Sequence, residues 1–442
     1  MRITRRSFLR RTAAGSLATI AAPAFLRGEN LNSKLQIAVV GANGQGFSDL
    51  NEIGSHSSAQ FVGFCDVDTT RFNQVEKKFP DIPHFQDFRE MFAKLGDKID
   101  ALQVSTPDHM HAFIALDAMR RGKHVYCQKP LTHTVWESRQ MRLQADKSKV
   151  ITQMGNQIHS ATEYRTAAKL LRDGTIGKLT AVHSWIGNAG NQFTKLVAAP
   201  PSTPVPATLA WDLWIGTAPQ RDFAPGVYHP FNWRDWQDFG SGALGDFGCH
   251  VLDPVFTALE LTAPVSIRAE NDGLNPQTWP HAETIAYIFP GTKFTAEKTL
   301  PLTWWDGGRR PNVALAQMPD EEKLPGGGSL FIGEGGTLVL PHVGMPKLYP
   351  AEKFSSFEIK KETGANHYHV WVDAVRANER TSDGFHYAGP LAEAVQLGNV
   401  ATRFPNETLT WDAAALRFSN KPEAERLLTK IYREGWKIEP VA

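Results

Sequence analysis

The segment Leu35-Gln-Ile-Ala-Val-Val-Gly-Ala-Asn-Gly-Gln-Gly46 decides the fold class of this chain. A short β-branched run, typical of a buried strand, ends at Gly41, and a stretch with helical spacing begins at Gly46. These two residues are the outer glycines of a G-x-G-x-x-G turn, whose backbone N–H groups bind a pyrophosphate. The middle position is Asn43, followed by Gly44, and Asn tolerates a positive φ better than most residues. We therefore predict a phosphate-binding turn made by Gly41, Asn43, Gly44 and Gly46.

An acidic residue follows at the spacing that a dinucleotide site requires. Asp66 ends the next strand-like run and comes about 20 residues after Gly46. A carboxylate there binds the hydroxyls of the adenosine ribose and repels a 2′-phosphate, and the first arginine after it is Arg71. We expect NAD as the cofactor in preference to NADP. The alternative is an ordinary strand–helix turn with a strand-end Asp.

Residues 31–155 alternate short β-branched runs with amphipathic stretches, which is typical of βαβ units around a parallel sheet. The strand-like runs are Leu35–Val40, Gln60–Cys65, Ala101–Ser105 and His124–Tyr126, and the helix-like runs are Phe47–Ile53, Thr70–Phe79, Phe85–Leu95 and His111–Arg121. We predict a Rossmann dinucleotide-binding domain over this range.

Residues 156–442 have a different pattern. Runs that indicate an antiparallel sheet are Leu179–Ile186, Val265–Glu270, Glu283–Phe289, Lys293–Leu300 and Leu330–Ile332, and helical spacing occurs in Tyr164–Arg172, Tyr368–Arg376 and Ala388–Asn399. Residues 198–240 are rich in Pro and Trp without a clear period, which favours a long loop with short elements on the substrate side. We predict a C-terminal α/β domain with a large, predominantly antiparallel sheet.

The N-terminus has the layout of an export signal. Thr4-Arg5-Arg6-Ser7-Phe8-Leu9-Arg10 opens the weakly apolar stretch Thr12–Phe25, which contains the small-residue site Ala22-Pro23-Ala24. The paired arginines followed by Phe-Leu resemble the twin-arginine (Tat) signal, whose machinery exports folded proteins. We expect residues 1–30 to be a cleaved signal and linker, and the mature protein to be periplasmic. An exported dinucleotide protein has no free pool of cofactor, so it should carry its cofactor with it.

The composition excludes several classes of protein. The chain is 42% hydrophobic and 21% charged, has a formal net charge of +1 and contains no basic tract, so we expect no nucleic-acid partner. No other segment is apolar for long enough to cross a membrane, so we expect no membrane span after cleavage. Cys65, Cys127 and Cys249 are too few and too sparse for a disulfide framework, and we expect them to be buried.

Two further motifs resemble the Gfo/Idh/MocA oxidoreductase family: Val104-Ser-Thr-Pro-Asp-His-Met-His111 and Gly122-Lys-His-Val-Tyr-Cys-Gln-Lys129-Pro130-Leu131. Gln128 stands where the family usually has Glu, but the lysine and the proline are kept. The resemblance implies that Lys129 lies beside the nicotinamide ribose and the reacting carbon, where an ammonium stabilises alkoxide character. It also implies a homodimer or homotetramer.

Asp246 and His250 lie in Gly240-Ser-Gly-Ala-Leu-Gly-Asp-Phe-Gly-Cys-His250, which matches the family's G-x-L-x-D-x-G-x-H pattern. Four residues apart, they share one face of a helix. The resemblance implies that His250 is the general base and that Asp246 binds a substrate hydroxyl or positions the imidazole. The alternative is a helix N-terminal Asp with a buried, structural His. We predict no metal site, because His109 and His111 lie on a different element and nothing else has ligand spacing.

The resemblance implies that Thr106, Pro107 and His111, at the end of the strand before the lysine motif, bind the nicotinamide half of the cofactor, and position and residue type add further candidates. For the nicotinamide half of the cofactor these are Asn156 and Gln157, and for the substrate they are Trp185, Arg234 and Trp236 beside Lys129, Asp246 and His250. Aromatic faces pack on sugar rings, although core packing explains any single Trp better than stacking on a ligand does.

Three functions remain open from the sequence. The first is an exported NAD(P)-dependent oxidoreductase of a sugar or polyol whose bound cofactor is recycled internally. The second is a glycosidase that acts by transient oxidation and elimination, although Gly307-Gly308-Arg309-Arg310-Pro311 lacks the His of the Gly-Gly-His-Gly-Gly segment found in such members of the family. The third is a non-catalytic sugar-binding protein, which Asn43 and Gln128 favour and which the intact Lys129, Asp246 and His250 disfavour.

Overall fold

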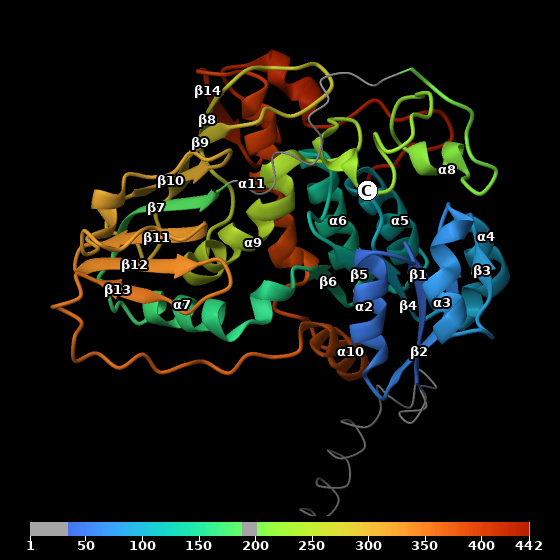
Figure 1. Cartoon of the computed structure of the whole chain (residues 1–442), viewed down its shortest axis with the longest axis horizontal. Coiled ribbons are helices and arrows are strands. Elements are labelled where there is room, and N and C mark those ends of the chain that lie inside the picture. The colour runs from blue at the N-terminus through green and yellow to red at the C-terminus, as the bar shows by residue number, and fades with distance from the viewer. Residues whose placement is uncertain (1–33, 188–200, 442) are drawn as a thin grey trace, which may run out of the picture.

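Two sheets organise the chain. The structure is a computed structural model that describes residues 34–187 and 201–441. The six-stranded sheet lies to the right in Figure 1 and the nine-stranded sheet to the left. The predicted signal, residues 1–30, lies outside the described residues, as does Asn188.

The first sheet is parallel throughout, in the order β3-β2-β1-β4-β5-β6. Its strands are β1 (Leu35–Val40), β2 (Ala59–Cys65), β3 (His84–Phe85), β4 (Ala101–Val104), β5 (His124–Gln128) and β6 (Thr152–Gly155). Its crossover helices are α2 (Gln45–Gly54), α3 (Asn73–Lys78), α4 (Phe88–Leu95), α5 (Asp108–Arg120) and α6 (Val135–Ser148). This is the Rossmann order, in which a crevice opens where β1 and β4 lead in opposite directions.

The second sheet has the order β13-β12-β11-β7-β10-β9-β8-β14-β15. Its strands are β7 (Leu179–Ile186), β8 (Ser266–Asn271), β9 (Glu283–Pro290), β10 (Thr299–Trp305), β11 (Gly327–Gly333), β12 (Gly336–Pro341), β13 (Lys347–Tyr349), β14 (Thr408–Asp412) and β15 (Arg417–Phe418). Among the strands of this sheet in the described residues, only β7 and β10 pair in parallel, which confirms the predicted antiparallel character.

One predicted strand, Lys293–Leu300, is wrong over most of its length. The strand begins only at Thr299, because residues 292–295 form a turn. In that turn the N–H of Thr292 donates to Thr295 Oγ1 at 2.8 Å, and the N–H of Thr295 donates back to Thr292 O at 3.1 Å. A local side-chain bond of this kind competes with a strand.

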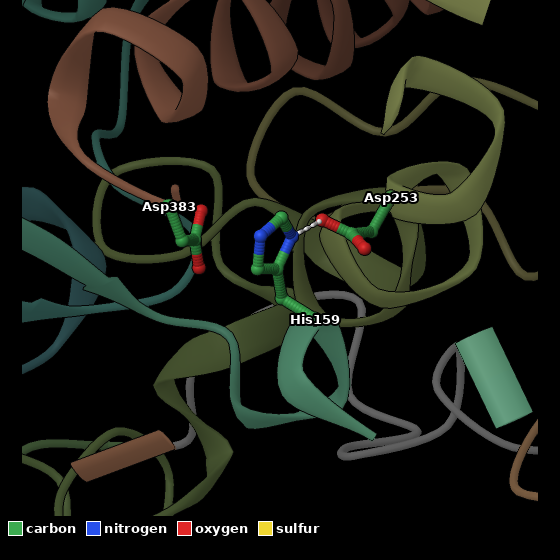
Figure 2. A group of neighbouring side chains, drawn as sticks. All are labelled: His159, Asp253 and Asp383. Atoms are coloured by element: carbon green, nitrogen blue, oxygen red, sulfur yellow. Dashed lines mark hydrogen bonds and ion pairs between the residues drawn. The ribbon is translucent and has the colours of Figure 1, made fainter. Parts of the chain in front are cut away.

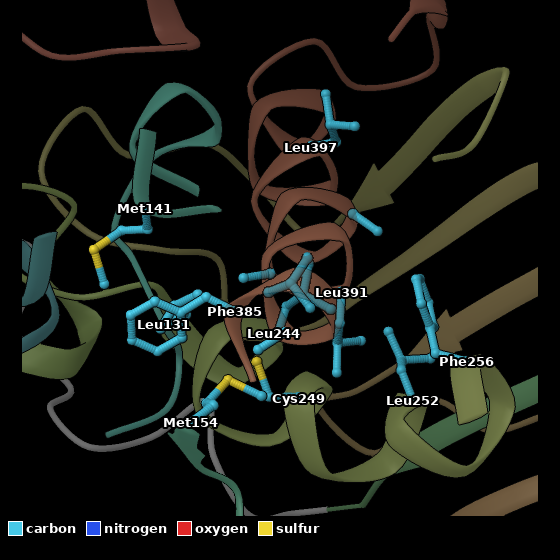
Figure 3. Close-up of a cluster of buried hydrophobic side chains, with 14 of the residues drawn as sticks. Leu131, Met141, Met154, Leu244, Cys249, Leu252, Phe256, Phe385, Leu391 and Leu397 are labelled. Atoms are coloured by element: carbon cyan, nitrogen blue, oxygen red, sulfur yellow. The ribbon is translucent and has the colours of Figure 1, made fainter. Parts of the chain in front are cut away.

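Helices α7 (Thr162–Arg172), α9 (Gly242–Leu259) and α11 (Phe385–Thr402) contact the nine-stranded sheet. Figure 3 shows the core between α9 and α11, with Leu244 and Cys249 beside Phe385 and Leu391, and with Met154 from β6 at its edge. The three cysteines are free and buried, as predicted. Both domains therefore share one core, and α9 is held in place by it.

Helix α10 (His367–Ala377) returns to the first domain and packs against α2. Trp371 is fully buried in a cluster that includes Ile37 and Leu50. A segment from late in the chain thus packs into the core of the Rossmann domain.

Residues 201–241 fold around an aromatic cluster on the short helix α8 (Trp211–Ile215), with Trp214, Tyr228 and Phe239 among its members. In the part of the chain that the structure describes, no helix combines the length and the apolar character that a bilayer-spanning helix needs.

We expect Trp371→Ala to lower the free energy of unfolding by about 3–5 kcal/mol, because it leaves a large cavity beside the Rossmann sheet. Chemical denaturation followed by circular dichroism measures this loss. Asp373→Ala, an exposed residue of the same helix, is the control and should change it by less than about 0.5 kcal/mol. Equal effects of the two substitutions would contradict the packing of α10 into this core.

Candidate active site

A cavity of about 430 Å³ opens at the carboxyl ends of the parallel strands. The Rossmann domain lines it with residues that include Gly41, Asn43, Gly44, Asp66, Thr106, Pro107 and Lys129, and the second domain adds Trp214, His229, Phe231, Trp233, Arg234 and Asp246. Seven of the predicted cofactor residues therefore meet at this cavity, which lies between the two domains.

The turn after β1 is built differently from our expectation for Asn43. Gly41 has a φ of 89° and Gly44 a φ of 58°, whereas Asn43 has an ordinary negative φ. The Asn43 side chain instead braces the turn, because its amide donates to Arg71 O at 2.9 Å and its Oδ1 accepts from Gly44 N at 2.7 Å. The extra glycine takes the strained position, so the departure at Asn43 leaves the turn intact.

Gly46 serves packing and does not line the cavity. A Cβ at this position would lie 1.9 Å from Gly41 O, so only glycine lets α2 begin this close to the turn.

Asp66 stands at the end of β2, where the predicted ribose contact should lie. Its Oδ2 accepts from Ala42 N at 3.1 Å and its Oδ1 from Asp68 N at 3.2 Å, and burial raises its pKa to about 6. Thr106 Oγ1 is buried at the cavity with no hydrogen-bond partner among the described residues. An acidic strand end, a glycine turn and an unsatisfied hydroxyl fit a bound dinucleotide.

Lys129 connects the two domains. Its Nζ donates to Asp246 Oδ1 at 2.7 Å and to Asp246 O at 2.8 Å, and Arg234 Nε lies 3.5 Å from the same carboxylate oxygen. Burial raises the pKa of Asp246, but Lys129 and Arg234 outweigh burial and hold this pKa below its ordinary value. An ammonium has three donors, so one N–H of Lys129 remains for a substrate oxygen.

His250 lies one helical turn beyond Asp246 on the same face of α9. Its Nδ1 is 2.5 Å from Asn156 Oδ1, and the Asn156 amide nitrogen donates to Cys249 O at 3.0 Å. Since Asn156 Oδ1 can only accept, Nδ1 of His250 carries the proton and Nε2 is left as the basic nitrogen. Burial lowers the pKa of His250, Lys129 and His342 lower it further, and Asp246 raises it. The pKa stays well below its ordinary value, so the imidazole is neutral.

Other predicted residues have roles that differ from our expectation. Both ring nitrogens of His111 contact backbone carbonyls, at Thr106 (2.7 Å) and Pro130 (2.8 Å), so it fixes the two loops beside the cavity. Asn156 positions His250, and Gln157 is exposed.

The prediction that Trp185 and Trp236 line a sugar pocket is wrong. Both are fully buried, and their indole N–H groups donate to Pro325 O and Val227 O. They are core residues, and neither face is open to a ring of a sugar. Of the predicted substrate residues outside the motifs, Arg234 lines the cavity.

Sequence reasoning missed several titratable residues in or near this site, among them His229, which lines the cavity, and Asp108 and His342, which lie close to it. Asp108, the first residue of α5, hydrogen-bonds with Ser241, and burial raises its pKa to about 7. His342 has its ring centroid 5.7 Å from that of His250, and its Nδ1 is 2.9 Å from Tyr164 OH. Asp108 lies inside the Thr-Pro-Asp-His motif, and this motif could have identified it as a site residue. The sequence around His342 contains no motif that points to a site.

Gln128, which stands where the family usually has Glu, also has a specific hydrogen-bond partner. Its amide nitrogen donates to both carboxylate oxygens of Asp49, at 3.0 and 2.9 Å, and Asp49 is fully buried. A glutamate at 128 would place two carboxylates together in the interior, at a high desolvation cost. Gln128 is therefore matched to Asp49 and is no sign of a decayed site.

Two models of one protein family match the chain. Residues 35–156 match its NAD-binding Rossmann fold and residues 162–292 its C-terminal alpha/beta domain. The chain belongs to the Gfo/Idh/MocA oxidoreductase family.

Individual relatives of this Gfo/Idh/MocA protein are distant. Levoglucosan dehydrogenase of Pseudarthrobacter phenanthrenivorans is 27% identical over 156 residues, which is 35% of this chain and 32% of that protein. Alpha-N-acetylgalactosaminidase of Shewanella oneidensis is 26% identical over 154 residues, 33% of each chain. These matches span about a third of the relatives' own length.

A solved structure extends the likeness in fold. The inositol dehydrogenase homolog of Azotobacter vinelandii, complexed with NADH and myo-inositol, has a TM-score of 0.58 at 15% identity and covers 86% of this chain and 98% of its own.

We expect Lys129→Met to lower kcat/KM by about 10²- to 10⁴-fold while NAD still binds, because the substrate oxygen loses its cationic donor. Steady-state kinetics and NAD titration measure the two effects. Lys421→Met, which removes a lysine paired with Glu407 at the surface, should leave both unchanged. A fully active Lys129 variant would show that this lysine only holds Asp246.

NAD affinity should weaken as the pH falls through about 6, the pKa of Asp66. Above this pH the carboxylate accepts from the ribose hydroxyls, and each pH unit below it costs up to about tenfold in affinity as the acid is protonated. Calorimetric titration across this range measures the change. Asp66→Asn should bind weakly with a flat profile, and Asp97→Asn, an exposed acid of the same domain, should retain the slope. A flat wild-type profile would argue against the ribose contact.

Proposed function

We propose that this protein oxidises or reduces a carbon of a sugar or polyol by hydride transfer and keeps its NAD through turnover. The observation that carries the proposal is the cavity itself. Gly41 and Asp66 line it on the nucleotide side, and Lys129, Asp246 and Arg234 line it as well. His250 is not among the lining residues and lies buried one helical turn beyond Asp246.

The chain's own residues would handle the oxygen and its proton. When bound, NAD supplies the hydride acceptor or donor. Lys129 donates its remaining N–H to the substrate oxygen and stabilises negative charge there. His250 Nε2 takes the hydroxyl proton during oxidation and returns it during reduction, and Asn156 holds the imidazole for this exchange. Asp246 and Arg234 offer an acceptor and a donor to neighbouring hydroxyls of the substrate.

Retention of the cofactor is supported by the segment 201–241. Its backbone is bonded to the end of β2, with Ala210 N donating to Val67 O at 2.8 Å and Thr69 N donating to Thr208 O at 2.9 Å. His229 Nε2 is 2.9 Å from Asp68 Oδ2, and His229 also lines the cavity. A dinucleotide bound in the cavity that this segment lines would leave only after these hydrogen bonds break.

Export through the Tat machinery and a periplasmic location belong to the same proposal. They rest on Arg5-Arg6 and the apolar stretch after it, and they agree with a cofactor that travels with the folded protein. Cell fractionation of wild type and an Arg5→Lys, Arg6→Lys variant tests this, and a wild-type chain found only in the cytoplasm would refute it.

We also propose a homodimer or homotetramer. The sheet face that carries Trp305 and Ile332 holds partly buried apolar side chains that a second copy could cover. Light scattering on a sizing column measures the assembly, and a monomer throughout would contradict it.

A redox-assisted glycosidase is the second candidate, favoured by the similarity to the alpha-N-acetylgalactosaminidase and by His342. A second neutral imidazole beside His250 could accept a proton from carbon, which elimination requires. Product analysis separates the candidates: an oxidised or reduced sugar supports the first, and a released aglycone supports the second.

Protein purified from the periplasm should contain nearly stoichiometric NAD or NADH, measured by heat release and mass spectrometry. His229→Ala should lose the nucleotide about tenfold faster, because it removes a bond to a charged group that holds segment 201–241. His56→Ala removes a similar His–Asp pair away from the cavity, to Asp373, and is the matched control. A wild-type protein that is empty and binds NAD weakly would refute retention and favour a sugar-binding protein.

A further inference from the structure

Three side chains far apart in sequence meet outside the proposed active site. His159 comes from the 3₁₀ turn Gln157–Ser160, Asp253 from α9 and Asp383 from the loop before α11. Figure 2 shows the imidazole between the two carboxyl groups, and their candidate ligand atoms all lie within 4.8 Å of one another. His159 Nδ1 is 2.8 Å from Asp253 Oδ1.

The carboxyl group of Asp383 is the unusual member. It is 1% exposed, and neither of its oxygens accepts a hydrogen bond from the described residues. The nitrogen of His367 that is 3.9 Å from Asp383 Oδ2 lies only 2.8 Å from Met154 O. A buried carboxyl group without partners is costly, so something must satisfy it.

An ion could reach this cluster. A second cavity, of about 450 Å³, is lined by His159 and Asp253 and by Ser382, the neighbour of Asp383. Arg165, Lys169 and Arg172 also line it, and their charges oppose a cation, but all three are exposed and therefore screened by solvent.

We propose that His159, Asp253 and Asp383 bind one divalent transition-metal ion, Zn²⁺ or Mn²⁺, with water from the cavity completing its coordination. One imidazole nitrogen with two carboxylate oxygens is a donor set that suits these ions better than Mg²⁺, which prefers oxygen alone. Tyr387 OH donates to Asp253 Oδ1 at 2.8 Å and fixes that carboxylate, as outer partners of metal ligands do.

The proposal differs from our sequence-based prediction of no metal. It does not depend on the proposed redox function. The ion would tie the loop after β6, which carries Asn156, to α9, which carries His250, and so would stabilise the pair that holds the proposed base.

The test is metal binding by the full mature chain. Chelator-stripped protein is dialysed separately against Zn²⁺, Mn²⁺ and Mg²⁺, and bound metal is measured by mass spectrometry together with the melting temperature. We expect one equivalent of Zn²⁺ or Mn²⁺ per chain, a higher melting temperature with that ion, and little Mg²⁺.

Asp383→Asn should weaken binding by at least about tenfold, because it removes the one ligand with no other partner. Asp306→Asn is the matched control, since Asp306 is an equally buried acid outside the cluster, and it should keep its metal. If Asp383→Asn does not fold, His159→Gln provides the same comparison.

The rival occupant is a proton, which would make His159 an imidazolium between two carboxyl groups. A wild-type chain that binds none of the three ions would establish this rival and overturn the proposal. Binding that is equal in wild type and Asp383→Asn would also overturn it, because the ion would then lie elsewhere.

Discussion

The ion pair between Lys129 and Asp246 is the contact on which the rest of the site depends. Lys129 follows β5 of the Rossmann sheet, and Asp246 belongs to α9 of the second domain. The 2.7 Å contact between them therefore fixes how the two domains are positioned relative to each other at the cavity. Neither charge is well solvated, and separating them would leave each buried without compensation. The pair therefore fixes which surfaces face each other across the cavity.

Helix α9 can serve the site because its other face is fixed by packing. Leu244, Cys249 and Leu252 are buried against α11 and the nine-stranded sheet, as Figure 3 shows. Asp246 and His250 then project from a helix that cannot rotate without opening this core. The proposed base, His250, is held by a rigid helix with its tautomer set by Asn156, and is therefore better positioned than a side chain on a loop.

The departures from the family pattern show how a buried polar group constrains its neighbours. Asn43 stands outside the strained conformation because Gly44 takes it, and Gln128 is an amide because Asp49 is the acid it meets. At Asn43 the turn is preserved, and at Gln128 the charge of the interior stays balanced, although both residues differ from the family pattern. A single motif position is therefore a poor guide to loss of function.

The sequence by itself determined the Rossmann domain, the antiparallel second sheet, the glycine turn and Asp66 at the end of the second strand, and the family resemblance added the lysine and histidine motifs. These features rest on short spacings, and hydrophobic period and helix register act over a few residues. Only the tertiary structure decided that Trp185 and Trp236 are core residues, that α10 completes the first domain, and that His342 stands beside His250. It also brought together His159, Asp253 and Asp383, which come from three separate elements. Their contacts depend on how helices and sheets pack around a shared core, and no local pattern in the sequence predicts that packing.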